Sequence, residues 1–280
     1  MKTLRLIGFG LFAVLLSFAF ASCDPDPDPE PVIPEPPTPE KRLAKMTIEE
    51  VEVDGGETFR WIETTLFNYD DQGRVVSVNE YSNEGEYSYE DSYTISYSNN
   101  EIICNRADVY EKETFRLSNG KIIQATEDFE FFTYTHSYEY NSQNYLSEII
   151  GNYDRYTLTW NGTQLASVKE SDTDGEQTFY NFNYDKTCKG YNPVVVLELA
   201  HSILYEGEIF PIITNPELAG IKTTHLVKES DEIEVDDDTE EKEYKYTYEL
   251  YDDGYLKSCR VQQYEDGEAD DYKIYNFTWE

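Results

Sequence analysis

The chain has 280 residues, with 57 acidic side chains against 22 basic ones, and a formal net charge of −35 at pH 7. A charge of this sign and size repels phosphate groups, which excludes nucleic acid as a partner and, without an anchor, anionic lipid surfaces.

The first 22 residues have the features of an export signal. Lys2 and Arg5 precede an apolar run, 6–20, that is too short and too early for a resident membrane helix. The run ends in Phe20-Ala21-Ser22-Cys23, which resembles the lipobox of bacterial lipoproteins, where the cysteine is acylated after cleavage. Phenylalanine in place of the commonest leucine leaves plain signal-peptidase cleavage open. We expect a signal peptide at 1–22 and lipidation of Cys23.

Residues 23–42 are predicted to form a stalk. Eight of the 11 prolines lie between Pro25 and Pro39, interspersed with acidic residues. Such a segment cannot bury apolar surface and favours extended polyproline II, at about 3.1 Å per residue. Acidic residues directly after a lipidated cysteine also resemble the signal that sends bacterial lipoproteins to the outer face of the outer membrane. A spacer without sorting content is the alternative to this outward-facing, lipid-anchored location.

Residues 43–280 are predicted to form one β domain built from a repeated hairpin. The first copy is the segment 67–78, in which an aromatic strand end, a polar turn at Gly73 and an aliphatic strand start follow one another. Similar turns occur at Gly120, Gly162 and Gly254, and others are expected near 98–100, 141–144 and 185–187. Asn-Gly and Asp-Gly pairs favour primed turns with positive φ at both centres. The spacing predicts an antiparallel up-and-down meander that curls strongly or closes into a barrel.

Within the predicted strands, aromatic residues alternate with polar ones, so that one face is aromatic and the other polar. The clearest runs are 132–140 and 244–250. Six residues of the aromatic face are the candidate ligand-binding residues: Tyr134, His136, Tyr138, Tyr244, Tyr246 and Tyr248. Tyrosine offers flat amphipathic surfaces that stack on sugars or dock proteins, although packing within the sheet would give the same pattern.

Two segments interrupt the repeat. Residues 192–226 hold an aliphatic run and the last three prolines, and are predicted to be an insertion packed over the end or inside of the sheet. Asn215, Pro216 and Gly220 would bound a single helical turn there. A hydrophobic plug is favoured over a ligand-gating lid. Residues 229–243 carry ten acidic side chains and are expected to form an exposed acidic loop or an overhanging hairpin.

The Tyr-Asp-x-x-Gly-Arg unit at 69–74 resembles the tyrosine-aspartate repeats of large bacterial shell proteins. Together, the lipobox, the acidic proline stalk, the aromatic hairpins and the sequence Asn-Pro-Glu-Leu-Ala-Gly-Ile at 215–221 resemble the lipoprotein family called domain of unknown function 4595. This resemblance covers most of the mature chain and implies a porin-like fold. It implies no catalytic residues, because that family has no known activity.

The cysteines and acids give no sign of a metal site or a cofactor. After Cys23, an odd number of cysteines remains at positions 104, 188 and 259, so at least one thiol is free, and Cys259 stands at an apolar position of its repeat. No cysteine or histidine cluster has zinc-ligand spacing. Asp172-Thr173-Asp174-Gly175 begins like a calcium loop, but Asn183 stands where the bidentate glutamate belongs. The Asp236-Asp237-Asp238 run is expected to be solvated.

No catalytic motif occurs, and the three histidines are isolated from one another, so we expect no enzyme activity. Tyrosine fills the middle of the predicted strands, whereas a membrane barrel needs an apolar outer band there, so we expect a soluble, tethered barrel. The favoured hypothesis is a non-catalytic surface module that binds glycan or protein. The alternative is a structural or assembly scaffold, which an uncovered edge strand at Leu43–Val53 would favour.

Overall fold

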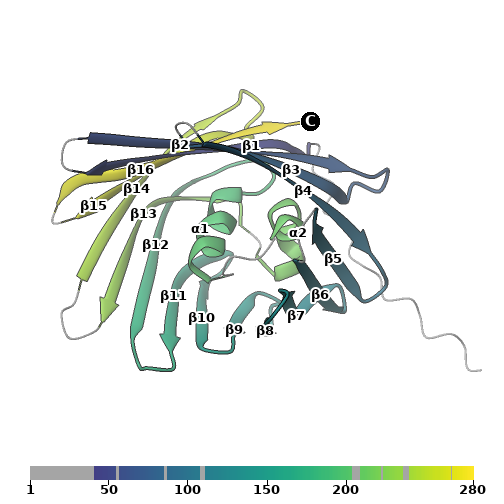
Figure 1. Cartoon of the computed structure of the whole chain (residues 1–280). Helices are drawn as coiled ribbons and strands as arrows, with labels where there is room; N and C mark the ends of the chain where they lie inside the picture. The colour runs from purple at the N-terminus through teal and green to yellow at the C-terminus, as the bar shows by residue number, and fades with distance from the viewer. Residues whose placement is uncertain are drawn as a thin grey trace, which may run out of the picture. The chain divides into compact units, whose positions relative to one another are not determined.

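In the computed structural model, the described residues are 41–54, 57–84, 87–107, 111–203, 209–221, 223–235, 240–265 and 267–280. They form a closed barrel of sixteen antiparallel strands in which sequence neighbours pair and the last strand closes on the first (Figure 1). The prediction of an all-β meander is confirmed, and of the two alternatives left open, a strongly curled sheet or a barrel, the barrel is the one that forms. The strands are β1 (Leu43–Asp54), β2 (Glu57–Tyr69), β3 (Val75–Glu84), β4 (Tyr87–Tyr97), β5 (Glu101–Arg106), β6 (Lys112–Ser118), β7 (Lys121–Asp128), β8 (Thr133–Tyr140), β9 (Leu146–Ile150), β10 (Asp154–Asn161), β11 (Gln164–Asp172), β12 (Gln177–Thr187), β13 (His225–Val235), β14 (Glu240–Leu250), β15 (Leu256–Glu265) and β16 (Glu268–Trp279).

The recurring glycine turns all join neighbouring strands at one rim of the barrel. Gly73, Gly120, Gly162 and Gly254 have positive φ and lie between paired strands. Both centres of a primed turn have positive φ only at Asn119-Gly120 among the described turns of this set. At Gly73 and Gly254 the loop is longer, and the glycine ends a turn in which its N–H donates to the carbonyl three residues earlier, that of Asp70 or Tyr251. The prediction of hairpin tips is confirmed, and the prediction of one turn type for all of them is wrong.

The expected turn at 185–187 does not form. β12 continues to Thr187 and pairs with β13 along its length, from Gln177 opposite Val235 to Thr187 opposite His225. The local sequence resembles the other turns, but the chain extends past that point because it next enters the barrel interior. An extended strand end keeps its backbone groups paired with β13 until the rim is reached.

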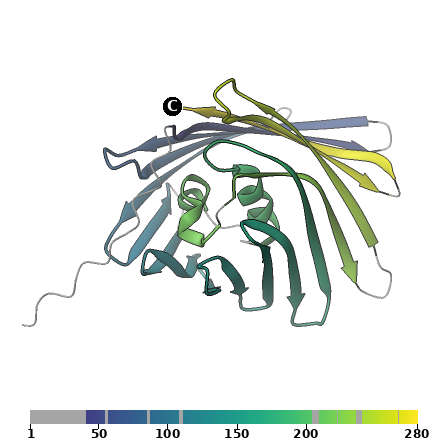
Figure 2. The ribbon, with the colours of Figure 1, turned by 180° about the vertical axis from the view of Figure 1, so that it is seen from behind.

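The insertion between β12 and β13 lies inside the barrel. It contains α1 (Pro193–Ile203), α2 (Phe210–Thr214) and the short 3₁₀ helix η1 (Pro216–Ala219), and views from both sides show the helices within the ring of strands (Figures 1 and 2). Phe210 lies with its ring centroid 4.9 Å from that of Tyr93 and 6.4 Å from that of Phe67. The predicted turn bounded by Pro216 and Gly220 is confirmed as η1, with Gly220 in the left-handed conformation.

The helical form of α1 follows from its place and not from propensity. Its first turns are rich in valine, which favours strands. All strand positions of the closed barrel are occupied, so a buried segment must satisfy its backbone groups internally, as a helix does. The Asn192 side chain accepts a hydrogen bond from the Val194 N–H at 3.1 Å, and Pro193 occupies the first helical position.

The insertion with α1, α2 and η1, which we call the plug, lies at the rim that carries the recurring turns. Leu146 N–H donates to Gly220 O at 3.4 Å, and Lys189 N–H donates to Gly254 O at 2.9 Å, so both ends of the insertion are fixed to hairpin tips. Arg42 and Glu280 exchange backbone hydrogen bonds at the same rim. Arg42, directly before β1, therefore lies at the plugged rim.

The acidic run 229–243 is not a loop. Its described residues belong to β13 and β14, which pair with each other as antiparallel strands; residues 236–239 lie outside the described residues. The hairpin alternative is therefore the correct one, because alternation along a strand lets successive carboxylates point to opposite faces. Ion pairs such as Lys228–Glu229, at 2.9 Å, reduce the repulsion.

Three buried thiols give a direct prediction. Cys104, Cys188 and Cys259 are free and buried, and burial raises the pKa of the Cys188 thiol to about 12. Because the thiolate is the reactive species, none of them should react with a thiol reagent in the native chain at pH 8, and all three should react after unfolding in denaturant. Counting reactive thiols in a Cys23→Ser variant measures this. Rapid labelling of any of the three in the native state would contradict the described packing.

Candidate functional site

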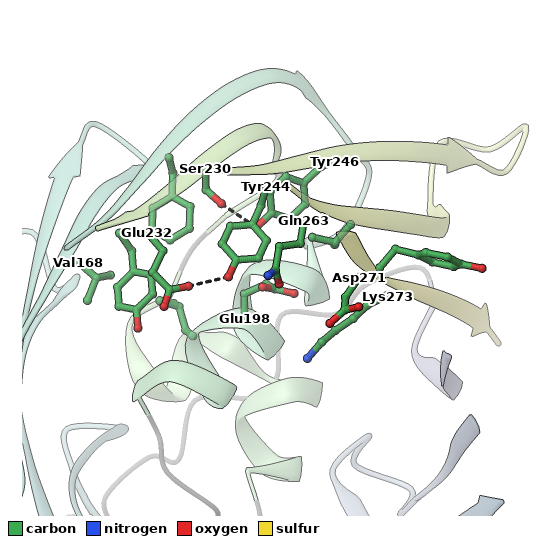
Figure 3. A pocket seen from close by; sticks show the side chains of 14 residues that line it. Val168, Glu198, Ser230, Glu232, Tyr244, Tyr246, Gln263, Asp271 and Lys273 are labelled. Carbon is green, nitrogen blue, oxygen red and sulfur yellow. Dashed lines mark hydrogen bonds between the residues drawn. The ribbon is translucent and has the colours of Figure 1, made fainter. Parts of the chain in front are cut away.

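A cavity of about 210 Å³ lies inside the barrel between α1 and the inner faces of neighbouring strands (Figure 3). Its lining is a mixture of aromatic, aliphatic and charged side chains. Gln263 and Asp271 line it close to the turn between β15 and β16, so the cavity extends from the plug toward the rim opposite the recurring turns. The lining residues are Val168, Tyr180, Phe182, Glu198, Leu199, Ser230, Glu232, Tyr244, Tyr246, Val261, Gln263, Asp271, Tyr272 and Lys273.

Glu198 brings a carboxylate into the cavity from the plug. It stands in α1 between buried Leu197 and Leu199, and its carboxylate points toward the strands (Figure 3). The Tyr275 hydroxyl donates to Glu198 Oε1 at 2.8 Å. Burial raises the pKa of the Glu198 carboxyl, because the charged form loses hydration; nearby Lys273 and the tyrosine hydroxyl act in the opposite direction.

Two tyrosines of β14 line the cavity and bond to β13. Tyr244 donates its hydroxyl to Glu232 Oε2 at 2.7 Å, and the Tyr246 hydroxyl lies 3.0 Å from Ser230 Oγ (Figure 3). Residues 230 and 244 are direct cross-strand partners, so alternation places all four side chains on the inner face. Each tyrosine is thereby fixed by its hydroxyl while its ring borders the cavity.

Lys273 of β16 supplies a positive charge at the cavity wall. Its Nζ lies 2.8 Å from Glu50 Oε1 on the adjacent β1, and the Trp61 indole N–H donates to Glu50 Oε2 at 2.6 Å. The Lys273 charge is therefore matched by Glu50 outside the cavity lining. The lining holds three carboxyl side chains, those of Glu198, Glu232 and Asp271, and this one basic side chain among the described residues.

The six predicted residues divide into two groups that the structure does not bring together. Tyr244 and Tyr246 line the cavity, whereas Tyr248 lies beyond them, its ring parallel to that of Tyr246 with centroids 6.4 Å apart. The residues of β8 lie on another part of the barrel wall and line no part of this cavity. These are Tyr134, His136 and Tyr138.

The β8 group has its own surroundings. Tyr138 is buried, and Tyr134 packs against Phe132 with ring centroids 5.3 Å apart. His136 Nε2 lies 4.0 Å from Asp154 Oδ1. Burial lowers the pKa of His136, and Asp154 opposes this. A neutral, partly buried histidine in an aromatic wall is the arrangement that results.

The predicted signal peptide, Cys23 and the stalk as far as residue 40 lie outside the described residues. The acidic residues 236–238 lie outside them too. Within the described part of the chain, no group of three His, Cys, Asp or Glu side chains is placed to hold a metal ion. At the calcium-like sequence, Asp172 Oδ1 accepts hydrogen bonds from the backbone N–H groups of Asp174, Gly175 and Glu176 at 2.7–2.9 Å. That carboxylate serves to close its own turn.

Comparison with models of protein families assigns this barrel to a family. The model of a family described as "Domain of unknown function (DUF4595) with porin-like fold" matches residues 67–258. The chain belongs to the DUF4595 family. The match runs from β2 to β15, and includes the plug with Glu198 and the hairpin with Glu232, Tyr244 and Tyr246.

Two solved structures share the DUF4595 barrel's fold. A porin-like protein from Bacteroides uniformis is 18% identical, with a TM-score of 0.63, over 85% of this chain and 98% of that one. A porin-like protein from Bacteroides vulgatus is 12% identical, with a TM-score of 0.54, over 86% and 99% of the two chains. Among curated proteins, none matches this sequence. These two structures show the fold of this DUF4595 chain, and any statement about its activity has to rest on the geometry of the cavity.

Sequence reasoning missed the charged residues of the site. Glu198 is the one acid in the most aliphatic segment after the signal, and that contrast was the available signal. Glu232 stands two positions after Ser230 and so shares its face, but the interpretation of 229–243 as a loop concealed this. Lys273 gave no signal, since its role in this DUF4595 domain depends on closure of β16 against β1.

None of the helices in the described part of the chain has the length and apolar character needed to cross a membrane.

Proposed function

We propose that this DUF4595 protein is a non-catalytic binding module of the cell envelope, and that its internal cavity takes a small part of a glycan or of a surface protein. The supporting observation is the cavity itself, where tyrosine rings and carboxylates from α1, β13 and β14 converge. Aromatic rings with a few well-placed polar groups are typical of small-ligand sites. At about 210 Å³, the cavity is smaller than the roughly 300–1,000 Å³ of pockets for drug-sized ligands. One sugar ring or the end of one side chain matches that size.

The architecture supports a binding role over a pore. Helices α1 and α2 occupy the interior next to the plugged rim. Outward positions of β14 are the exposed Lys245, Thr247 and Glu249, unlike the apolar band that lipid-facing strands require. A chain anchored through Cys23 and tethered by the stalk would enter at the plugged rim, and the cavity extends toward the other one. This arrangement suits a module that presents its cavity away from an outer membrane to which it is lipid-anchored.

The scaffold alternative would be favoured by an uncovered edge strand at Leu43–Val53, and the described strands do not include one there. β1 pairs with β2 on one side and with β16 on the other, so the segment Leu43–Val53 is not an uncovered edge.

The test is binding of the chain to arrays of surface polysaccharides and to purified envelope proteins, compared with a Tyr244→Ala variant. Tyr244 lines the cavity, so its replacement should weaken binding about tenfold or more, because it removes an aromatic contact and a hydrogen bond that together contribute about 1–3 kcal/mol. Tyr81→Ala is the matched control, because Tyr81 lies on the outer face of β3 and is 39% exposed. Binding that is absent, or that both variants retain in full, would count against the proposal.

A further inference from the structure

Carboxyl side chains outnumber basic ones in the lining of the cavity. Carboxylates reach the lining from three elements, as Glu198 of α1, Glu232 of β13 and Asp271 of β16. Among the described residues that line the cavity, Lys273 is the one with a basic side chain, and it forms an ion pair with Glu50. A cavity bounded by several carboxylates and one already paired lysine has a negative potential, strengthened by the low dielectric around it.

Two of these carboxylates accept hydrogen bonds from neutral donors. Tyr275 donates to Glu198 and Tyr244 donates to Glu232. A neutral hydroxyl satisfies one lone pair but brings no positive charge. Partly buried carboxylates without a full counter-charge are costly, and burial accordingly raises the pKa of Glu198. A ligand with a positive charge would remove that cost, and a neutral ligand would not.

The remaining walls suit the same kind of group. Four aromatic rings border the cavity, and the faces of such rings attract ammonium groups within about 6 Å. Aromatic rings combined with carboxylates form the usual cage for alkylammonium ions. The rings are those of Tyr180, Phe182, Tyr244 and Tyr246. The Tyr272 ring alternates with inward Lys273 and so lies on the outer face of β16, where the Arg260 guanidinium is 3.7 Å from its centroid.

We infer that the cavity binds its ligand through an ammonium group, held among the tyrosine rings and paired with Glu198 and Glu232. The inference rests on the proposed binding function and names the chemistry of the ligand. An amino sugar of a glycan and a lysine side chain of a protein both present this group.

Calorimetric titration of the full chain tests the inference with matched probes. Glucosamine is compared with N-acetylglucosamine and glucose, and the peptide Gly-Lys-Gly with its Nε-acetylated form. Binding of an ammonium probe should exceed that of its acetylated form at least tenfold and weaken as salt rises, because the contact is ionic. The preferred probe of the two pairs identifies the source of the ammonium group.

Glu232→Gln keeps the shape of the side chain and an acceptor for the Tyr244 hydroxyl while removing the charge. It should weaken the ammonium probe about tenfold or more, the range for a hydrogen bond to a charged group. Glu229→Gln is the control, since Glu229 lies on the same strand and pairs with Lys228, and it should change affinity less than twofold. Thermal unfolding of both variants checks that the fold is retained, and Glu198→Gln replaces Glu232→Gln if the latter is unfolded.

The outcomes separate the inference from the function on which it rests. Equal binding of acetylated and free amines, unchanged by Glu232→Gln, would overturn the inference and leave a neutral-ligand module. Binding of none of the probes at millimolar concentration would overturn it as well, and array binding lost on Tyr244→Ala would then still support the proposed function.

Discussion

Replacement of Gly220 by alanine should lower the free energy of unfolding by about 2–4 kcal/mol, from the left-handed backbone penalty and overpacking together. Gly220 ends η1 with φ +66°. A Cβ there would lie 2.8 Å from Asn144 O, 2.9 Å from the Tyr140 ring and 3.0 Å from Leu146 N. Two of these three atoms belong to the backbone of the β8–β9 turn, so relief requires the plug or the rim to move.

Gly162→Ala is the matched control for this substitution. Gly162 has φ +63°, close to that of Gly220, but nothing lies within 4 Å of the position of its Cβ. It should therefore show the backbone penalty alone, about 1–2 kcal/mol. Denaturant unfolding of both variants at equal pH measures the difference, which reports the contact between plug and rim. Equal losses for the two glycines would mean that the plug is not held against the β8–β9 turn.

The regular part of the barrel could be predicted because its signals are local. A turn such as Asn119-Gly120 needs only its own residues to adopt positive φ, and alternation at 244–248 needs only the geometry of a strand. The segment around Tyr184 shows the limit of this logic. It carries the same kind of sequence and remains extended, because its fate is decided by the insertion that follows and by pairing with β13.

The plug was predictable in place but not in form. Pro216 and Gly220 predicted the turn that became η1, since both residues restrict the backbone locally. The valine-rich start of α1 carries strand propensity, and only the closed sheet around it makes a helix the better solution. Tertiary context of this kind cannot be read from a window of neighbouring residues.

The candidate site was half predictable for the same reason. Tyr244 and Tyr246 follow from the aromatic face of a strand, which alternation reveals. The carboxylates with which they share the cavity come from α1, β13 and β16, elements that meet only once the barrel has closed around its insertion. Glu198 is a polar residue in an apolar segment, and its partners in the cavity are far from it in the sequence. Local sequence patterns do not predict such residues, and functional sites are often built from them.

Glu80 should make the stability of the barrel depend on pH near neutrality. It lies on β3 between Thr65 of β2 and Asp91 of β4, and Thr65 donates to its Oε1 at 3.2 Å. Burial first, and then the charge of Glu63, raises the pKa of Glu80 to about 7, with a smaller contribution from Asp91. The folded chain therefore holds this proton more tightly than the unfolded chain does. Its stabilising contribution is complete below about pH 4.5, the ordinary value for glutamate, and is lost as the pH rises through 7.

The expected loss between pH 5 and pH 8 from Glu80 alone is about 2–3 kcal/mol, after allowance for its partial exposure. Glu80→Gln should match the wild-type chain near pH 5 and exceed its free energy of unfolding by about that amount at pH 8. Glutamine keeps the acceptor for Thr65 and never carries the charge that Glu63 and Asp91 repel. Glu90→Gln, on the outward face of β4 and exposed, is the control and should leave the pH profile in place. Urea unfolding at several pH values measures all three chains, and a Glu80→Gln profile as steep as that of the wild type would show that the buried charge lies elsewhere on the inner wall.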